Sequence, residues 1–409
     1  MAPSFIQDCF AERILSNGFE INKFEKIKRA KKDAIGRHPD VQLIDLGVGE
    51  PDAMADPQVI HALNTASAKP ENRGYADNGG QPFREAAAHF MKSSFGVNLD
   101  PNTELVHSIG SKVALSILPA CFINPGDIAL TTTPGYPVFG THTRYYGGTA
   151  YALPLLAKNK FLPDLKSVPQ DILERSKVII LNYPNNPTGA CASEEFYKRL
   201  IDWAHKHEIV LINDAAYSHL TFEHKPSSLL QFDGAKEISL ELHSLSKNFN
   251  MTGWRLGWVC GNANLVAAYA AVKDNTDSGQ FLAIQEAGAT ALKHPEIIQT
   301  TTEKYQRRMK LMTSALQDLG LDASPSAGTF FLFIKTPKRA SHNGTTVEFN
   351  SAAAFSEWLI LEELISTVPW DEAGAHTRIS LTFEADTKEK EHAVIQILKA
   401  RLGKYTFSF

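Results

Sequence analysis

Residues 177–214, KVIILNYPNNPTGACASEEFYKRLIDWAHKHEIVLIND, decide the fold. Two apolar, β-branched runs, Lys177–Leu181 and Ile209–Asp214, flank an amphipathic stretch that begins at Ser193 and ends at His207. Continuous apolar runs are typical of strands buried on both faces, and a serine followed by two glutamates is typical of a capped helix start. The order strand, helix, strand predicts an α/β fold with a largely parallel sheet.

The sequence on either side continues this alternation. Helical periodicity covers Val113–Phe122, and three more apolar runs read as strands. These runs are Asp127–Thr132, Glu237–His243 and Arg255–Cys260. We therefore expect a central sheet with helices on both faces.

After about residue 290 the pattern changes and predicts a smaller α+β unit that packs with the N-terminal arm. Helices are expected at Pro295–Leu319, Ala352–Leu364 and Lys388–Leu402, strands at Gly328–Lys335 and Arg378–Phe383, and a polar loop around Ser341–Thr346. The expected domains are residues 1–45 (N-terminal arm and part of the small domain), 46–290 (large domain) and 291–409 (small C-terminal domain).

Composition excludes several classes of protein. The 409 residues include 41 Lys and Arg against 45 Asp and Glu, so the net charge of −4 gives no electrostatic case for nucleic acid or an anionic membrane surface. Gly (26) and Pro (21) occur at ordinary frequency and 43% of the chain is hydrophobic, which excludes disorder and collagen-like repeats.

The cysteines and the apolar segments predict the compartment. The four cysteines are Cys9, Cys121, Cys191 and Cys260. They form no CxxC and no Cys/His cluster, so we expect buried thiols in a reducing compartment, with no disulfide framework and no metal site. Asp8 and Glu12 stand where a signal peptide would be basic and then apolar, and the longest apolar stretch, Leu265–Val272, is far shorter than the ~20 residues of a membrane helix. We expect a cytoplasmic protein.

One segment has the residue types of a reactive amine beside a phosphate site. It runs SLSKNFNMTGWR from Ser244 to Arg255, directly after a predicted buried strand. A desolvated lysine such as Lys247 can form a Schiff base with an aldehyde or ketone. Serine hydroxyls (Ser244, Ser246) and a bidentate arginine (Arg255) suit a phosphate dianion. The alternative is an exposed loop lysine with an unrelated arginine.

Three further segments carry polar groups where ligands bind in α/β proteins. Asn185–Gly189 (NNPTG) follows a strand at the carboxyl edge of the sheet, although it could be only a turn. Asp214 ends the next strand, with Tyr217 behind it; a buried acid needs a partner such as a protonated pyridine nitrogen, unless it caps a helix. Ser108–Lys112 (SIGSK) precedes a helix whose first N–H groups could bind an anion, or is a plain helix start.

Taken in order, these four segments resemble the fold-type I, pyridoxal-phosphate-dependent aminotransferases of the class I/II group, over nearly the whole chain. Within that group, three stretches are similar to the LL-diaminopimelate aminotransferases and their close relatives: Phe10–Ile14, Phe24–Ile27 and Ile44–Asp52. Tyr75–Gly80 departs from the commoner form of that family, which indicates a divergent branch.

The resemblance implies a role for each residue around the cofactor, pyridoxal 5'-phosphate. Lys247 would hold it as a Schiff base and move the substrate's Cα proton. Asp214 would keep the pyridine nitrogen protonated, and Asn186 and Tyr217 would hydrogen-bond the phenolic oxygen. Tyr136 would stack on the ring, unless it only packs a loop. The phosphate would be bound by Ser111 and Lys112 through their backbone, by Ser244, Ser246 and Arg255, and by Tyr75 of the partner subunit.

The resemblance also implies the substrate contacts. Arg378, rather than being a surface strand-end arginine, would bind the α-carboxylate, with Gly47 and Asn186 beside it. Lys112 would meet the distal carboxylate of LL-diaminopimelate, and Asp77 of the partner subunit its distal ammonium. Both could instead be structural, Lys112 as a phosphate contact and Asp77 as a turn residue.

The expected function is therefore transfer of an amino group between LL-diaminopimelate and 2-oxoglutarate, in lysine and peptidoglycan-precursor biosynthesis, by a homodimer with shared active sites. The expected partners are amino acids and 2-oxo acids, without nucleic acid or membrane. The alternatives are a broad alanine or aspartate aminotransferase, an aminocyclopropane-carboxylate synthase, a C–S β-lyase, and a non-catalytic regulatory protein that keeps the cofactor fold.

Overall fold

The computed structural model, which describes residues 9, 11 and 23–409, contains the predicted strand–helix–strand unit. The strand β5 (Ser176–Leu181) pairs in parallel with β6 (Val210–Asp214), and α9 (Glu194–His207) connects them. Ser193 is the N-cap: its Oγ accepts a hydrogen bond from the backbone N–H of Phe196 at 3.2 Å. The capped, acidic start of α9 was therefore readable from the sequence.

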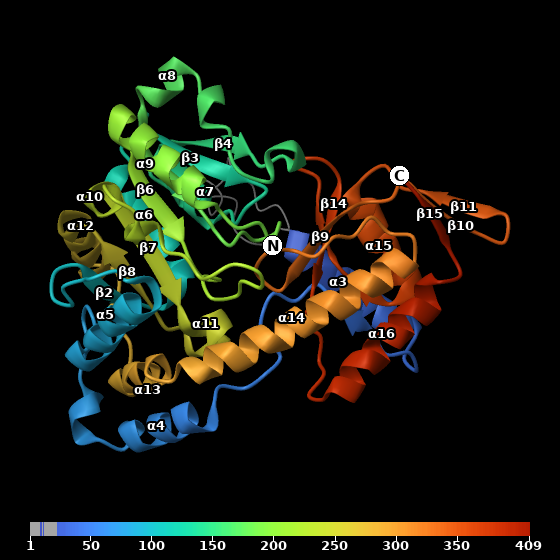
Figure 1. Cartoon of the computed structure of the whole chain (residues 1–409), viewed down its shortest axis with the longest axis horizontal. Helices are drawn as coiled ribbons and strands as arrows, with labels where there is room; N and C mark the ends of the chain where they lie inside the picture. The colour runs from blue at the N-terminus through green and yellow to red at the C-terminus, as the bar shows by residue number, and fades with distance from the viewer. Residues whose placement is uncertain (1–8, 10, 12–22) are drawn as a thin grey trace.

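A seven-stranded sheet lies at the centre of the larger part of the molecule (Figure 1). Its order is β2-β8-β7-β6-β5-β3-β4. The remaining strands are β2 (Leu105–Ser108), β3 (Ile128–Thr133), β4 (Thr149–Pro154), β7 (Ser239–Ser244) and β8 (Gly257–Gly261). Only β8 runs opposite to the other six strands of this sheet, so the prediction of a mostly parallel sheet is confirmed.

Helices bury both faces of this sheet, because adjacent residues of one strand enter opposite cores. Ile179 and Leu211 pack with α9, whereas Ile180 and Ile212 pack with α6 (Gly110–Phe122) and α12 (Ala263–Asp274). A third core joins α4 (Pro57–Ser67), α5 (Gln81–Phe95) and α13 (Leu282–Leu292).

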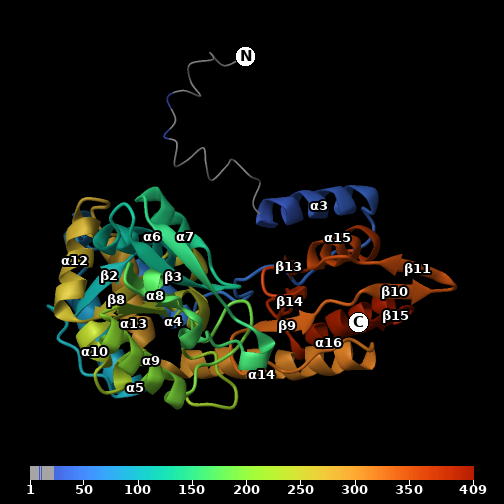
Figure 2. The ribbon, with the colours of Figure 1, turned by 90° about the horizontal axis from the view of Figure 1, so that it is seen from above.

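The C-terminal part builds a smaller α+β unit that lies beside the large sheet. A three-stranded antiparallel sheet, β13-β14-β9, lies between α3 and α15 on one side and α14 and α16 on the other (Figure 2). The bounds are α3 (Lys23–Arg37), α14 (Pro295–Asp318), β9 (Phe331–Lys335), α15 (Ala352–Glu363), β13 (Val368–Trp370), β14 (His376–Ser380) and α16 (Lys388–Leu402). The long helix α14 runs from the large part to the small one (Figure 1).

The described part of the N-terminal arm packs on this unit. The helix α3 contacts α15, and β1 (Ile44–Asp45) pairs in parallel with β12 (Ile365–Ser366). The division of the chain at residues 45 and 290 stays a prediction. The expected motif Phe10–Ile14 lies outside the described residues, apart from Ala11.

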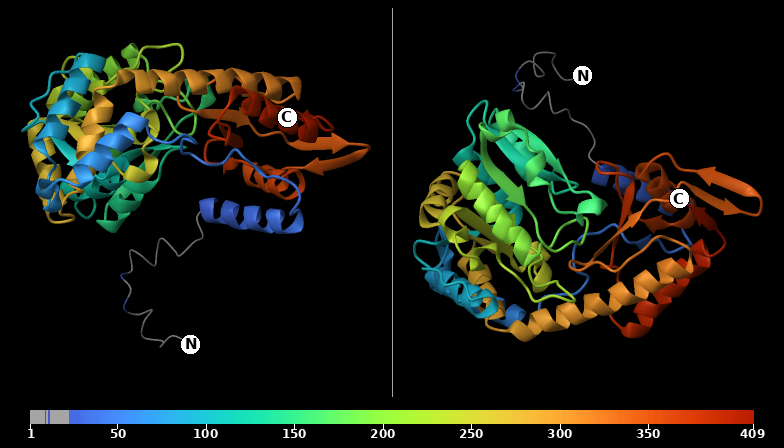
Figure 3. Two further views of the ribbon diagram at one scale, coloured as in Figure 1. Left: turned by 90° about the horizontal axis from the view of Figure 1, so that it is seen from below. Right: turned by 45° about the horizontal axis from the view of Figure 1, so that its top comes forward.

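The polar loop expected around Ser341–Thr346 is wrong. This segment forms a hairpin of β10 (Arg339–His342) and β11 (Thr345–Glu348), which extends away from the large sheet (Figure 3). Asn343 and Gly344 make the two-residue turn with φ of 48° and 80°, as the tightest hairpins require. The strand β15 (Thr406–Ser408) pairs with the other edge of β10.

Three expected strands are shifted along the sequence, two because of a left-handed residue and one because of its pairing. The strand β9 begins at Phe331 and not at Gly328, because Thr329 has a left-handed φ of 64°. The strand β8 begins at Gly257 and not at Arg255, which has a φ of 57°. The strand β14 spans residues 376–380 and not 378–383, since its partner β9 offers residues 331–335 for pairing.

The cysteines agree with expectation in part. Cys260 is buried, Cys121 and Cys191 are half-buried, and Cys9 is exposed, so the expectation of a buried thiol is wrong for Cys9. Among the described helices, none is long and apolar enough to cross a bilayer.

Candidate active site

Polar side chains from the four segments that carry the predicted cofactor chemistry meet in one cavity of about 560 Å³ at the carboxyl ends of β5, β6 and β7. Eleven of the predicted site residues line it. They are Ser111, Lys112, Tyr136, Asn186, Asp214, Tyr217, Ser244, Ser246, Lys247, Arg255 and Arg378. The position agrees with the rule that open α/β sheets bind ligands beyond the carboxyl ends of their strands.

Lys247 lies in the short helix α11 (Leu245–Asn248), which follows β7 and is capped by Ser244. Its Nζ donates a hydrogen bond to the carbonyl of Gly49 at 2.7 Å. Burial lowers the pKa of Lys247 to about 8, although the nearby Glu50 acts in the opposite direction. About a tenth of this amine is therefore unprotonated at pH 7, far more than for an ordinary lysine, and can act as a nucleophile.

Asp214 ends β6 with only 6% of its surface exposed. One carboxylate oxygen accepts a hydrogen bond from the N–H of Ala216 at 3.3 Å. Burial raises the pKa of Asp214 from 3.8 to about 7. The charge of Lys247 acts in the opposite direction without forming an ion pair, so this carboxylate is suited to a ligand that brings a positive charge.

Four groups form an anion site beside Lys247. The helix α6 begins at Gly110, three residues earlier than predicted, so Ser111 and Lys112 stand in its first turn with free N–H groups. Arg255 lies against this turn, and its Nη1 is 3.4 Å from the Oγ of Ser246. A side chain at Gly110 would place its Cβ 2.5 Å from Nη2 of Arg255, so glycine is what permits this approach.

Arg378 lies opposite, on β14, with 3% of its surface exposed. Its Nη1 donates to Oδ1 of Asn186 at 3.0 Å and its Nη2 to the carbonyl of Gly47 at 2.8 Å. The guanidinium stacks 4.1 Å above the ring of Phe331, and its Nε has no partner among the described residues. Burial lowers the pKa of Arg378 to about 10, so it remains a fixed cation at neutral pH.

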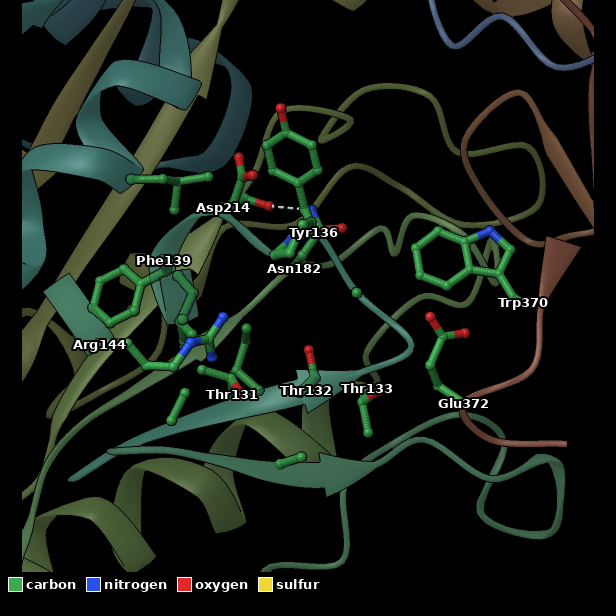
Figure 4. Close-up of a pocket in the computed structure, with 18 residues that line it drawn as sticks. Thr131, Thr132, Thr133, Tyr136, Phe139, Arg144, Asn182, Asp214, Trp370 and Glu372 are labelled. Atoms are coloured by element: carbon green, nitrogen blue, oxygen red, sulfur yellow. Dashed lines mark hydrogen bonds between the residues drawn. The ribbon is translucent and has the colours of Figure 1, made fainter. Parts of the chain in front are cut away.

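Tyr136 stands between this cavity and a smaller one of about 240 Å³ (Figure 4). In the smaller cavity, Tyr136 and Asp214 lie across from the threonines of β3, with the Tyr136 ring pointing away from them, while Trp370 and Glu372 approach from the C-terminal part of the chain. Asn182 lines both cavities, and its Nδ2 donates to the backbone carbonyl of Asp214 at 2.7 Å. This bond fixes the end of β6 against the loop that follows β5.

Three predicted residues are not in the wall of this chain's cavity. Gly47 lies just behind it, where its carbonyl orients Arg378. Tyr75 is 85% exposed, and Asp77 has a left-handed φ of 39° in the same loop before α5. Their positions require a second subunit if these two side chains are to reach a cavity.

Among the wall residues that sequence reasoning missed are Glu50, Asn182 and Phe331. Asn182 and Glu50 could have been found, because the first follows a predicted strand directly and the second lies within the quoted stretch Ile44–Asp52. No sequence signal placed Phe331 under Arg378, since they meet only when β9 pairs with β14.

The residues present suit pyridoxal 5'-phosphate. A buried carboxylate without a cationic partner, an amine of lowered pKa, and an anion site with an arginine lie in one cavity, in the arrangement that a pyridine nitrogen, an aldehyde and a phosphate require. The fold and the cavity together define a pyridoxal-phosphate-dependent transferase of fold type I.

The comparisons with known proteins narrow this class. The family described as aminotransferase class I and II matches residues 41–397. The chain is 52% identical over 419 residues to the LL-diaminopimelate aminotransferase of Methanocaldococcus jannaschii, covering 99% of each chain. It is 44% identical to the LL-diaminopimelate aminotransferase of Aquifex aeolicus, covering 88% of this chain and 92% of the other. The chain belongs to the class I and II aminotransferase family.

Solved structures agree. The substrate-bound BacF structure from Bacillus subtilis superimposes with a TM-score of 0.83 at 31% identity, covering 98% of both chains. A Thermus thermophilus aspartate aminotransferase single mutant superimposes with a TM-score of 0.84 at 26% identity, covering 96% of this chain and 99% of the other. The predicted fold, cofactor and enzyme class are confirmed: this is a pyridoxal-phosphate-dependent aminotransferase, acting on amino acids and 2-oxo acids.

Proposed function

We propose that this enzyme transfers an amino group between LL-2,6-diaminopimelate and 2-oxoglutarate, interconverting them with tetrahydrodipicolinate and glutamate. The reaction would serve lysine and peptidoglycan-precursor biosynthesis in the cytoplasm. The observation that carries the substrate assignment is the 52% identity to the Methanocaldococcus jannaschii LL-diaminopimelate aminotransferase across 99% of both chains. The cavity supports the chemistry, because it joins a reactive amine with two arginines that suit anionic groups.

The residues that would hold the cofactor surround the cavity on all sides. Lys247 would attach it covalently, and Asp214 would face its protonated pyridine nitrogen. Tyr136 would stack on the ring. Asn186 and Tyr217 would donate to the phenolic oxygen, which Tyr217 can do because burial raises the pKa of its hydroxyl well above the ordinary value. When bound, pyridoxal phosphate supplies an electron-withdrawing ring that stabilises negative charge at the substrate's Cα.

The phosphate would occupy the anion site. The N–H groups of Ser111 and Lys112 in the first turn of α6, the hydroxyls of Ser244 and Ser246, and the guanidinium of Arg255 all line that side of the cavity. Tyr75 of the partner subunit would add a hydroxyl. Hydrogen bonds from charged donors to phosphate are the strong ones, so Arg255 would contribute most.

Lys247 would then move the proton. With the amine free, Nζ would take a proton from Cα of the amino acid in one half-reaction. In the other half-reaction it would return a proton to Cα. A pKa of about 8 lies close to neutral pH, where a general base and general acid are both effective. The carbonyl of Gly49, 2.7 Å from Nζ, would hold the amine in place between the two transfers.

Arg378 would bind the α-carboxylate that all substrates share. Its guanidinium is already oriented by Asn186, Gly47 and the ring of Phe331, so little ordering is lost on binding.

Replacing Arg378 by alanine is therefore expected to raise the KM for amino acid and oxo acid alike. Charged hydrogen bonds are worth about 1.5–3 kcal/mol each, which is roughly 10- to 150-fold. Steady-state kinetics with each substrate varied in turn would measure this, with the exposed Arg339→Ala, which lies on β10, as a matched control. An unchanged KM for both substrates would place the carboxylate elsewhere.

The distal end of LL-diaminopimelate carries an ammonium and a carboxylate, and so needs charges of both signs. Lys112 lines the cavity and would meet the distal carboxylate. Asp77 of the partner subunit would meet the distal ammonium, and its loop is held by a hydrogen bond from Lys273 Nζ to the Asp77 carbonyl at 2.8 Å. Glu50, which lines the cavity within the same chain, is a second acceptor for that ammonium.

The enzyme would act as a homodimer with shared active sites. The exposure of Tyr75 supports this arrangement, since a tyrosine of that exposure has no packing role in its own subunit. A neighbouring copy would bury it.

An amino-donor comparison tests the substrate assignment. We expect the kcat/KM for LL-diaminopimelate, with 2-oxoglutarate as acceptor, to exceed that for alanine, aspartate and aromatic amino acids by about tenfold or more. Alanine and the aromatic donors leave Lys112 unpaired, and aspartate has a shorter side chain and no distal ammonium. The meso isomer should be a poor donor. In Lys112→Met the preference should shrink while the kcat/KM for alanine, which has no distal group, changes little. A donor tenfold better than LL-diaminopimelate would overturn the substrate, but not the reaction class.

A further inference from the structure

Gln280 is a half-buried amide that uses all its hydrogen-bonding groups just outside the cavity. It precedes α13, and its Nε2 donates to the backbone carbonyls of Trp254 and Arg255, at 2.8 Å each. Its Oε1 is 3.0 Å from Nε2 of the buried His107. The amide is therefore fully paired, and it links the segment that carries Arg255 to the strand β2.

The backbone that Gln280 holds has an uncommon conformation. Arg255 has a φ of 57°, which residues with a side chain seldom adopt unless their surroundings maintain it. This turn sends the guanidinium back toward α6, so that Nη2 lies against Gly110 at the start of that helix. Nη1 donates to the carbonyl of Thr252, in the arginine's own segment, at 2.7 Å. Without the turn, Arg255 would follow the direction of β8 and leave the cavity.

We propose that Gln280 is a positioning residue for the phosphate of the cofactor. By anchoring the carbonyls of Trp254 and Arg255, it keeps Arg255 in the left-handed turn that directs the guanidinium into the anion site. It does this without being part of the cavity wall. The inference rests on the placement of the phosphate at Arg255 proposed above, and not on the identity of the amino donor.

A second amide fixes Gln280 to the loop that carries Tyr75. Gln285 is 1% exposed, donates from Nε2 to the Gln280 carbonyl at 2.8 Å, and accepts at Oε1 from the N–H of Gly80 at 2.8 Å. The backbone N–H of His107 donates a hydrogen bond to the backbone carbonyl of Asn78 at 3.2 Å. Gln280 thus belongs to a buried unit that joins the base of Arg255 to the base of the loop that would reach the partner subunit.

Cofactor binding to the full-length enzyme separates positioning from a general structural role. We would titrate pyridoxal 5'-phosphate and pyridoxal, which lacks the phosphate, into wild type, Gln280→Met, Arg255→Ala and the double variant, following the visible absorbance of the bound aldehyde. Methionine keeps the volume of glutamine but cannot donate. Gln299→Met, at an exposed glutamine of α14, is the matched control.

The proposal predicts a loss confined to the phosphate. Gln280→Met should weaken the binding of pyridoxal 5'-phosphate about tenfold and the binding of pyridoxal less than about twofold. The tenfold loss is the order expected when a buried carbonyl loses its hydrogen-bond donor. In the Arg255→Ala background, Gln280→Met should weaken the binding of pyridoxal 5'-phosphate by less than about twofold, because the effects of two coupled residues do not add. Gln280→Glu keeps the acceptor for His107 but turns a carboxylate toward two carbonyls, so it should weaken the binding of the two aldehydes as Gln280→Met does. It replaces Gln280→Met in the experiment if that variant does not fold.

Each contrary result identifies what fails. Equal weakening of both aldehydes, or full additivity with Arg255→Ala, would show that Gln280 is only structural and would overturn this inference. If Arg255→Ala discriminates between the two aldehydes and neither Gln280 variant does, the inference fails while the phosphate site stands. If Arg255→Ala itself does not discriminate, the proposed phosphate site fails and the inference with it.

Discussion

Lys247→Ala is expected to abolish nearly all turnover and to remove the visible absorbance of the covalently held cofactor. The variant loses the amine that would attach the cofactor and move the Cα proton, and proton transfer by a positioned group is alone worth roughly 10²–10⁴-fold. Amino-group transfer from LL-diaminopimelate to 2-oxoglutarate would measure the loss, and an absorbance spectrum of the purified variant would measure the attachment.

A charge-matched variant controls for indirect effects. Lys247→Arg keeps a cation beside Gly49 but cannot form the covalent bond or accept a proton at neutral pH, so it should be as inactive as the alanine variant. Normal turnover and an unchanged spectrum in either variant would contradict the assignment of Lys247.

Asp214→Ala is expected to have the second-largest effect. A buried charge pair that loses one member costs about 3–5 kcal/mol, which corresponds to roughly 10²–10³-fold or more in rate. We expect that loss in the half-reaction with an amino acid donor, measured at saturating cofactor, because Asp214 is the carboxylate that would keep the pyridine nitrogen protonated.

Asp214→Asn separates the chemistry from folding. Burial raises the pKa of Asp214 from 3.8 to about 7. Between these two pH values the folded, cofactor-free protein binds a proton that the unfolded chain releases. As the pH rises through this range, the free energy of unfolding therefore falls, because ionisation of the buried carboxyl opposes folding. The neutral asparagine should therefore leave the free energy of unfolding of the cofactor-free protein at pH 8 unchanged or higher, while the half-reaction remains impaired. A variant that reacts at the wild-type rate would refute the role of this carboxylate.

The core of the site could be predicted because its residues lie at regular places in an α/β fold. Asp214 and Lys247 follow strands whose apolar, β-branched runs are unambiguous, so their positions at the carboxyl edge of the sheet are predictable from the alternation of strands and helices. Ser111 and Lys112 were placed by the glycine that opens α6.

Other features depend on contacts between distant segments, which periodicity does not report. Phe331 lies under Arg378 only through the pairing of β9 with β14. The antiparallel direction of β8 depends on how the chain returns from α11. The hairpin at Asn343-Gly344 has a recognisable turn, but β11 is exposed along its whole length, so no apolar alternation revealed its strands.

The residues expected from a partner subunit are the hardest to predict, for a physical reason. Tyr75 and Asp77 lie outside the cavity of their own chain, and the roles proposed for them, at the phosphate and at the distal ammonium, need a second copy. One sequence contains both halves of such a site without indicating how they meet.

The nitrogen balance of a single reaction tests the central claim most directly. The purified enzyme, loaded with pyridoxal 5'-phosphate, would be supplied with LL-diaminopimelate and 2-oxoglutarate, and glutamate and ammonia would both be quantified. The account predicts one glutamate for each LL-diaminopimelate consumed, no ammonia, and no reaction when 2-oxoglutarate is omitted beyond one turnover per active site. Sustained release of ammonia, or consumption of LL-diaminopimelate without glutamate, would contradict it.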